Sequence, residues 1–228
     1  MNNLVKIITL SGLFLFSSIV NASFQLETMT VLVDASEPRT VFSVKNITKE
    51  PILLSSKVVS IDEQDIVSNK DIIISPPITR IEPEQSQQIN FVVRKGAEIQ
   101  TEAILKVSFQ GVGAAKTNVA RMPIRQDIAM LITPKGISIN NSPWSELKVS
   151  QKGDQLTLKN MGKQVVRLVP NIITMPNNES YNLEQYFIRP NESKSITVKN
   201  KLDEIKFTPL SRYGFKVKED AVIKVIQE

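Results

Sequence analysis

The sequence predicts an all-β protein made of two sandwich domains, and three observations support this. Valine, isoleucine and threonine recur in short runs with period-two alternation, bounded by proline, glycine, asparagine and serine. No segment keeps an apolar period of 3.6 residues over three turns, so long amphipathic helices are not expected. The chain has 228 residues, a length that suits two domains of ~100 residues each better than one core.

The first 22 residues are typical of a secretory signal peptide. Lys6 precedes a mostly apolar run over residues 7–20, and Ala22 supplies the small residue at which a signal peptidase cuts. A membrane anchor is the alternative, but a run of ~14 residues is shorter than the ~20 needed to span a bilayer. We therefore expect export through the Sec pathway, cleavage after Ala22 and a mature chain that begins at Ser23. No later stretch approaches spanning length, so no membrane insertion is expected after the signal is removed.

The expected strands form two series with a break in the middle of the chain. The first series comprises residues 24–33, 40–45, 52–60, 71–75, 87–94, 103–110 and 119–132. The second comprises residues 156–159, 164–169, 193–198 and 221–226. Residues 175–180 are polar and rich in asparagine, as expected of an exposed loop. Pro134 cannot donate a ladder hydrogen bond and Gly136 relaxes the backbone, so the first series should end here. We expect an N-terminal domain over 23–134 and a C-terminal domain over 135–228.

The composition restricts the chemistry that this chain can perform. It contains no histidine and no cysteine. It therefore lacks the usual general base, disulfides, thiol nucleophiles and zinc sites built from these residues. The net charge is +5, but the basic residues are dispersed and do not form a stripe beside stacking aromatic side chains, which argues against nucleic-acid binding. We expect no cofactor, no metal and no nucleic-acid partner.

Several motifs resemble the periplasmic chaperones that assemble pili (fimbriae). Residues 72–84, IIISPPITRIEPE, combine a short apolar strand, a Pro-Pro break, another short strand and an acidic proline turn, as in the middle of these chaperones. Residues 40–46 resemble the family's second strand, which ends in asparagine, and residues 101–107 resemble the strand that precedes its donor strand. Residues 156–160 and 213–214 echo positions of its second domain. The order and spacing of these motifs carry the resemblance.

This resemblance implies two immunoglobulin-like β-sandwich domains set at an angle, with a cleft between them that holds the client. The clients of this family are pilus subunits that lack their last strand, and the chaperone completes the subunit's sheet with a donated strand. The resemblance also implies a periplasmic location, delivery of the subunit to an outer-membrane usher, and no catalysis. The departures at Thr30, Ala129 and Thr133, where the family has charged residues, suggest a divergent branch, of the kind called alternate or archaic. The absence of cysteine and the short connection over residues 111–118 also argue against the branch with a long loop and a disulfide.

The run over residues 119–132 has the pattern expected of the donated strand. One pleat face carries four apolar side chains, interrupted only by a glutamine: Ala120, Met122, Ile124 and Ile128. Pro123 argues for an edge position, because a central strand would lose a ladder hydrogen bond. An unusually long exposed edge implies a specific partner strand that covers it. An ordinary half-buried last strand is the alternative interpretation.

The subunit's C-terminal carboxylate needs a cationic partner. In the family, an arginine early in the first strand and a lysine near the end of the donor strand hold it, but Thr30 and Ala129 occupy those positions here. A desolvated carboxylate without a partner is costly, and arginine can donate two parallel hydrogen bonds to it. Arg125, on the expected donor strand, is the first candidate for this anchor, with Arg39 and Arg121 as alternatives. Solvated surface charge is the other interpretation of all three.

An ion pair is expected at the joint between the domains. Glu82 lies in the acidic proline turn, and Arg212 stands where many relatives have an acidic residue. Many relatives also have an arginine where this chain has Thr133. We therefore expect Glu82 and Arg212 to pair across the cleft and set its angle, contributing about 0–1 kcal/mol of stability.

Two other functions are compatible with parts of the sequence. A secreted adhesin or binding module with two immunoglobulin-like domains would account for the export signal and the strands, but not for the proline pattern before the long strand. A carboxylate-based glycosidase needs paired acidic residues. Asp62, Glu63 and Asp65 lie in a polar, loop-like stretch, where solvated charge is the expected role. We therefore expect no catalytic residues and no enzyme.

Overall fold

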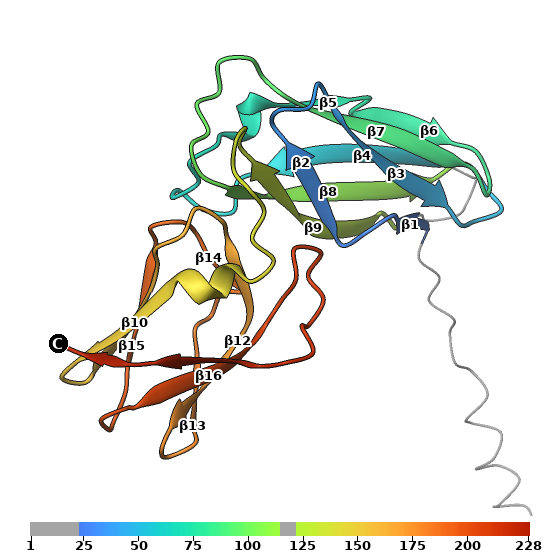
Figure 1. Cartoon of the computed structure of the whole chain (residues 1–228). Coiled ribbons are helices and arrows are strands. Elements are labelled where there is room, and N and C mark those ends of the chain that lie inside the picture. The colour runs from blue at the N-terminus through green and yellow to red at the C-terminus, as the bar shows by residue number, and fades with distance from the viewer. Residues whose placement is uncertain (1–22, 115–121) are drawn as a thin grey trace, which may run out of the picture.

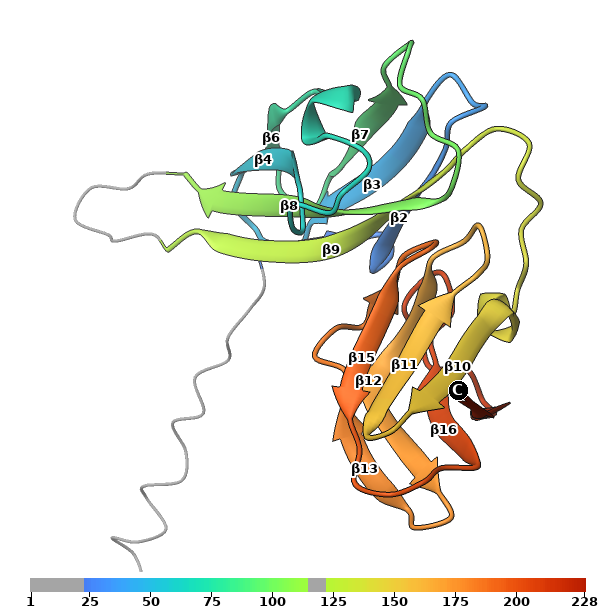
Figure 2. The same cartoon turned by 90° about the vertical axis from the view of Figure 1, so that its left-hand side faces the viewer.

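The computed structural model describes residues 23–114 and 122–228, which form two β-sandwiches set at an angle (Figure 1 and Figure 2). Eighteen strands make up these sandwiches, and the helical elements of the described residues are two short 3₁₀ helices, η2 (Asn69–Asp71) and η3 (Pro143–Glu146). The prediction of two immunoglobulin-like sandwiches is confirmed. Within the described ranges, no helix is long and apolar enough to cross a membrane. The predicted signal peptide, Ala120 and Arg121 lie outside the described residues.

The first sandwich contains a four-stranded and a five-stranded sheet. The four-stranded sheet has the order β1 (Phe24–Leu26), β3 (Thr40–Asn46), β7 (Ser86–Val93), β5 (Ile72–Ser75). The five-stranded sheet has the order β2 (Thr30–Asp34), β9 (Ile124–Thr133), β8 (Ala103–Gly113), β4 (Ile52–Val59), β6 (Ile78–Ile81). Alternate side chains of both sheets meet in one core, where the rings of Phe42 and Phe109 stack with centroids 5.5 Å apart.

The first predicted strand, over residues 24–33, is two strands in different sheets. β1 pairs with β3, whereas β2 pairs in parallel with β9. The chain changes sheet at Glu27–Met29, where the Thr28 hydroxyl donates to the Thr30 carbonyl (2.7 Å). Because β1 leaves for the other sheet, β2 covers only part of the length of β9.

The second sandwich also contains two sheets, packed around a separate apolar core. One sheet has the order β15 (Ser193–Thr197), β11 (Gln155–Asn160), β10 (Leu147–Lys152), β18 (Ile226–Gln227). The other has the order β13 (Glu179–Asn182), β12 (Val166–Met175), β16 (Glu204–Pro209), β17 (Ala221–Lys224), with β14 (Phe187–Ile188) also paired to β12. The predicted exposed loop over 175–180 is shorter than expected, because β12 and β13 form a tight hairpin there.

A buried asparagine ends the equivalent strand of each domain. The side-chain amide of Asn46, at the end of β3, donates to the Ile81 carbonyl (3.1 Å). That of Asn160, at the end of β11, donates to the carbonyls of Gln164 (2.8 Å) and Ile188 (3.0 Å). Each asparagine satisfies backbone acceptors that would otherwise be buried without partners. The matching roles of the two asparagines also indicate that the two domains have the same kind of fold.

Candidate functional site

The domains meet through a small apolar cluster of their own, defined here as the junction cluster. Its buried members are Ile104 and Leu131 from the first domain and Val165 and Phe187 from the second. Leu32, Ile61 and Ala129 pack around them. The odd-numbered side chains near the end of β9 therefore face the second domain, while its even-numbered side chains face the core of the first.

Glu102, immediately before β8, is the central polar contact of the junction, and its side chain is only 1% exposed. One carboxylate oxygen meets Arg212 Nη2 (2.7 Å) and accepts from the Thr133 hydroxyl (3.0 Å). The other oxygen accepts from the amide of Val165 (2.9 Å), and the Glu102 amide donates to the Lys163 carbonyl (2.8 Å). Burial raises the pKa of the Glu102 carboxyl, while Arg212, Val165 and Thr133 act in the opposite direction.

The predicted Glu82–Arg212 pair is wrong, although Arg212 does form an ion pair across the junction. Glu82 pairs with Arg80 at the surface (2.8 Å), and both side chains are more than half exposed. The reason lies in the sheet order. Glu82 follows β6, at the far edge of the sheet, whereas Glu102 precedes β8, whose first residue pairs with Ile132 at the end of β9.

Removal of the Glu102 carboxylate should destabilise the protein strongly. Glu102→Ala leaves Arg212 and the Val165 amide without their buried partner, which costs about 3–5 kcal/mol by comparison with other broken buried pairs. Glu82→Ala removes an exposed pair and should change the free energy of unfolding by about 0–1 kcal/mol. Urea unfolding of both variants measures the difference. Equal effects would contradict the assignment of Glu102 as the central contact.

Arg167 of β12 reaches across the junction to the position where the family resemblance expects an arginine. Its Nη1 donates to the Thr30 hydroxyl (2.8 Å) and to the Arg212 carbonyl (2.7 Å). Thr30 lies beside Ala129 in the β2–β9 pairing, so both positions named by the resemblance are neighbours. Burial lowers the pKa of Arg167, while the charge of Glu102 acts to raise it. The arginine therefore presents a partly desolvated cation at Thr30.

Gly214 gives the Arg167 side chain room. A Cβ at Gly214 would lie 3.1 Å from Nη2 of Arg167, and the glycine adopts a φ of +87°, which favours glycine over other residues. The short motif over residues 213–214 thus makes room for an arginine of the domain junction. In Figure 1 its loop, between β16 and β17, reaches toward the first domain.

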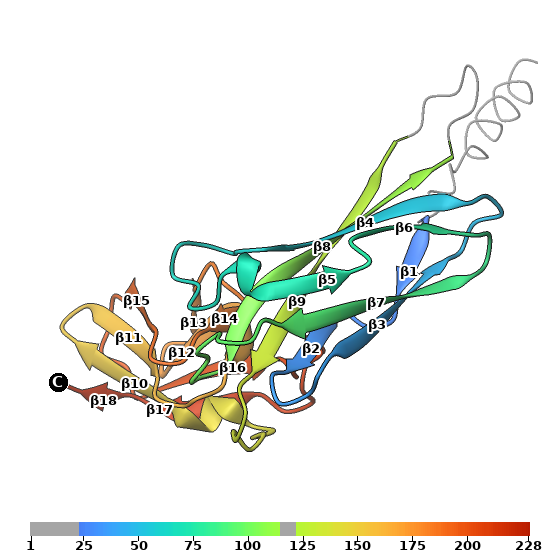
Figure 3. The same ribbon diagram turned by 90° about the horizontal axis from the view of Figure 1, so that it is seen from above.

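The first half of β9 has an open edge. β2 pairs only with Ala129–Thr133, so within the described residues no strand pairs with the opposite side of Ile124–Ile128 from β8. The amide of Gln126 reaches over to the Phe24 carbonyl (3.1 Å). Figure 3 shows that β8 and β9 extend beyond the rest of the first domain.

The predicted donor face is divided by the structure. Ile128 is 4% exposed and belongs to the core of the first domain, so it is not free to contact a partner as expected. Ile124 is half-buried at the margin of that core, and Met122 is 86% exposed. The prediction for Ile128 failed because alternate side chains share one face along the whole strand, whereas the opposite sheet covers only part of that face. The covered part includes Ile128.

The two predicted carboxylate anchors that the structure describes, Arg125 and Arg39, are at the surface. Arg125 donates twice to Asp127, from Nε (2.9 Å) and from Nη2 (2.6 Å), and its side chain is 55% exposed. This pairing raises the pKa of Arg125. Arg39 is exposed in the turn between β2 and β3. Neither contacts Thr30, in contrast to Arg167.

Asp127 should remain ionised to a lower pH than an ordinary aspartate. The hydrogen bond from Arg125, followed by that from Ser108, lowers the pKa of Asp127 from 3.8 to about 2 against the effect of burial. Because the folded pKa lies below the unfolded one, the stabilisation is present above pH 3.8 and is lost as the pH falls through about 2. NMR titration of the side-chain carboxyl measures this, and Arg125→Ala should move the midpoint up. A midpoint near 3.8 in the parent would contradict it.

Asp62 and Asp65 are ion-paired across the junction, contrary to the prediction of solvated charge, although Asp62 remains partly exposed. They accept from Nη2 of Arg189, in the second domain, at 2.9 and 2.6 Å. The Asp65 side chain is 4% exposed. The loop pattern of the sequence was interpreted correctly, but its partner lies more than a hundred residues away along the chain.

Fold and site together define a class: a two-domain immunoglobulin-like protein with an open-edged, partly apolar strand next to a tightly bonded domain junction. The family of pili and flagellar-assembly chaperones, through the PapD N-terminal domain, matches residues 23–138. The uncharacterized fimbrial chaperone YhcA of Escherichia coli (strain K12) is 30% identical over 195 residues, which cover 83% of this chain and 85% of that protein. This chain belongs to that chaperone family.

Solved structures share the fold. A chain in the complex of Salmonella enterica SafA pilin with the SafB chaperone has a TM-score of 0.72 and 17% identity, over 91% of this chain and 98% of that chain. A chain in the CsuC–CsuE chaperone–tip adhesion subunit complex of archaic Csu pili from Acinetobacter baumannii has a TM-score of 0.61 and 16% identity, over 91% of this chain and 100% of that chain. At these identities the likeness concerns the fold alone.

Proposed function

We propose that this protein binds pilus subunits by donating strand β9 to a client that lacks its last strand. The observation that carries the proposal is the open edge at Ile124–Ile128, which adjoins the exposed Met122. In strand addition, the free backbone groups of such an edge provide affinity, and its alternate side chains provide specificity. Membership of the chaperone family supports the same mechanism.

The two faces of the open edge have different roles in this mechanism. Met122 and Ile124 continue the core-facing pleat beyond the sandwich, so they enter the client's apolar groove. Arg125 and Asp127, on the opposite face, are charged and exposed. Charged side chains on a free edge discourage pairing with unrelated strands. One apolar and one charged face therefore favour pairing with a specific client strand over aggregation.

Arg167 is the group that we propose as the anchor for the client's C-terminal carboxylate, in preference to Arg125. Its guanidinium already lies at Thr30, and the neighbouring Ala129 carries no charged group that would compete for the carboxylate. Arg125 is occupied by Asp127 and points away from the core-facing pleat. A partly desolvated arginine binds a carboxylate more strongly than an exposed one.

The setting of this activity follows from the N-terminal sequence and from the relatives. A signal peptide cleaved after Ala22 would deliver the chain to the periplasm, and the client would pass from the chaperone to an outer-membrane usher. SafB is described as a chaperone in complex with a pilin, and CsuC as part of a chaperone–usher system. The proposed role is binding and transfer, without a catalytic step.

The test compares two forms of one pilus subunit encoded with this chaperone. The first form lacks its last strand, and the second carries that strand fused in cis. We expect native mass spectrometry to show a 1:1 complex with the first form only. An adhesin or general binding module would not distinguish the two forms, and binding of both would contradict strand donation.

A further inference from the structure

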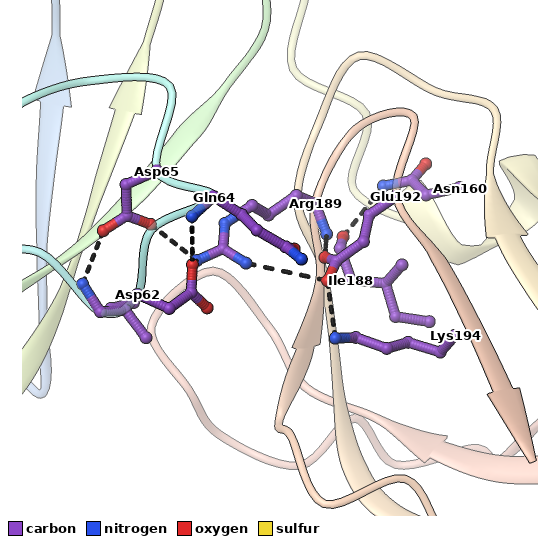
Figure 4. A network of polar contacts seen from close by, with 9 residues as sticks. Asp62, Gln64, Asp65, Asn160, Ile188, Arg189, Glu192 and Lys194 are labelled. Carbon is purple, nitrogen blue, oxygen red and sulfur yellow. Dashed lines mark hydrogen bonds and ion pairs between the residues drawn. The ribbon is translucent and has the colours of Figure 1, made fainter.

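A second polar contact joins the domains, separate from the one at Glu102. We define the Arg189 clasp as five charged residues, drawn in Figure 4: Asp62, Asp65, Arg189, Glu192 and Lys194. Nη2 of Arg189 meets Asp65 at 2.6 Å and Asp62 at 2.9 Å. Glu192 meets Lys194 at 2.6 Å and Arg189 Nη1 at 3.7 Å. The side chains of Arg189 and Asp65 are 8% and 4% exposed, so this is a buried ion pair.

On the first-domain side, hydrogen bonds within their own loop hold the two aspartates in place. Asp65 uses its second oxygen to accept from the Ile61 amide (2.6 Å), and Asp62 accepts from the Gln64 amide (2.9 Å). Val67, just beyond, is buried in the core of the first domain. Two carboxylates are thereby fixed in a short loop and oriented toward the second domain.

The second-domain side is equally fixed. The Arg189 amide donates to the Glu192 carboxylate (2.7 Å), and the Glu192 amide donates back to the Arg189 carbonyl (3.1 Å). The Asn191 amide donates to the carbonyl of Asn160, the buried asparagine that ends β11. The guanidinium also lies 4.8 Å from the ring centroid of Phe187, a member of the junction cluster. The clasp and the cluster are one structural unit.

The clasp joins the two domains at a position where it can restrict the angle between them. Glu102 and Arg189 line the same hollow of about 200 Å³, but they bind different partners: Glu102 meets Arg212, whereas Arg189 meets Asp62 and Asp65. A single contact would let one domain rotate about it, whereas two distinct polar contacts and an apolar cluster oppose that rotation. Opening the clasp would leave the buried Asp65 carboxylate without Arg189, which is energetically unfavourable.

We infer that the Arg189 clasp fixes the angle between the two domains, and that Arg189 and Asp65 are positioning residues for client binding. They do not touch the proposed donor strand. They hold the second domain, and with it Arg167, in register with β9. The part of this inference that concerns the client rests on the proposed function, but the part that concerns the angle does not.

Distances between spin labels test the angle without any client. The chain contains no cysteine, so Lys57→Cys in β4 and Lys152→Cys in β10, both exposed, create the only labelling sites. We expect a narrow distance distribution in the parent and a broadened or displaced one in Arg189→Ala. Arg80→Ala, which removes an exposed ion pair within the first domain, is the matched control and should not change the distribution.

Two further variants keep the test decisive if Arg189→Ala does not fold. Asp65→Asn retains an acceptor for the Ile61 amide but removes the charge, and it should broaden the distribution from the first-domain side. Arg189→Lys retains the charge but offers one nitrogen in place of the two that meet the aspartates and Glu192, so it should give an intermediate width. A parent-like distribution in a folded Arg189→Ala or Asp65→Asn variant would overturn the inference.

Client binding provides the second readout. Arg189→Ala should lower client affinity by roughly 10-fold, within the usual range of coupling between sites. Arg80→Ala should bind like the parent, and Arg189→Lys should recover part of the loss. If the parent itself binds no subunit, the proposed function fails while the distance result stands. If the distances broaden but affinity is unchanged, the positioning role is refuted.

Discussion

Met122→Asp should remove most of the client affinity while leaving the chaperone folded. Met122 is 86% exposed, so its replacement should change the free energy of unfolding by only about 0.5 kcal/mol. In the proposed complex, its burial would contribute about 1.5–3 kcal/mol, which corresponds to a loss of roughly 10- to 100-fold in affinity. The introduced carboxylate adds a desolvation cost, so the measured loss should lie at or above this range.

Ile124→Asp should act in the same direction, with one difference. Ile124 is half-buried at the margin of the first-domain core, so its variant should also lose stability. The double variant should leave no subunit recoverable from the periplasm. Val222→Asp is the control, since Val222 is 55% exposed on β17 of the second domain. Isothermal titration with purified subunit measures affinity, and normal binding by Met122→Asp would disprove the donor-strand assignment.

Arg167→Ala should have the other large effect. Removal of one partner from a buried, hydrogen-bonded charge pair costs about 2–5 kcal/mol, equivalent to roughly 30-fold to several thousand-fold in affinity. The same substitution also removes the hydrogen bond to Thr30. Thr30→Val separates the two effects, because it removes the interdomain hydrogen bond but keeps the cation. We expect Thr30→Val to bind nearly as well as the parent.

A client with an amidated C-terminus isolates the anchor itself. Amidation should weaken binding to the parent by about as much as Arg167→Ala does, and should have little further effect on that variant, as expected for two groups that contact each other. Arg125→Ala is the comparison, because Arg125 was the candidate from sequence and is paired with Asp127. If amidation still weakens binding to Arg167→Ala but not to Arg125→Ala, Arg125 is the anchor and our proposal is wrong.

Local patterns account for most of what could be predicted about the fold. Period-two alternation located β3, β4, β7 and β8 to within a few residues, because alternate side chains of these strands enter the core of the first domain. Some strands of the second domain were not predicted although their side chains alternate, among them the six-residue strands β10 and β16 (Leu147–Lys152 and Glu204–Pro209). The change of sheet between β1 and β2 was also missed, because both segments are apolar and extended and only their partners differ.

Charged residues were the least predictable part of the site. Glu102 stood within a motif that carried the family resemblance, yet its partner Arg212 lies 110 residues further along, so sequence spacing gave no reason to pair them. Arg167 and Arg189 carried no signal of their own. Buried arginines and carboxylates look like solvated ones in a sequence, because burial depends on the packing of both domains.

The sequence by itself determined the class of fold, the family and the strand that we propose as the donor, because alternation, proline breaks and motif order are properties of local chain segments. Only the tertiary structure decided which part of that strand is open. The sandwich covers Ile128 and leaves Met122 exposed, a distinction that depends on where the opposite sheet ends. It also decided which charges meet across the junction, since Glu102 and Asp65 find their arginines only when the second domain packs against the first.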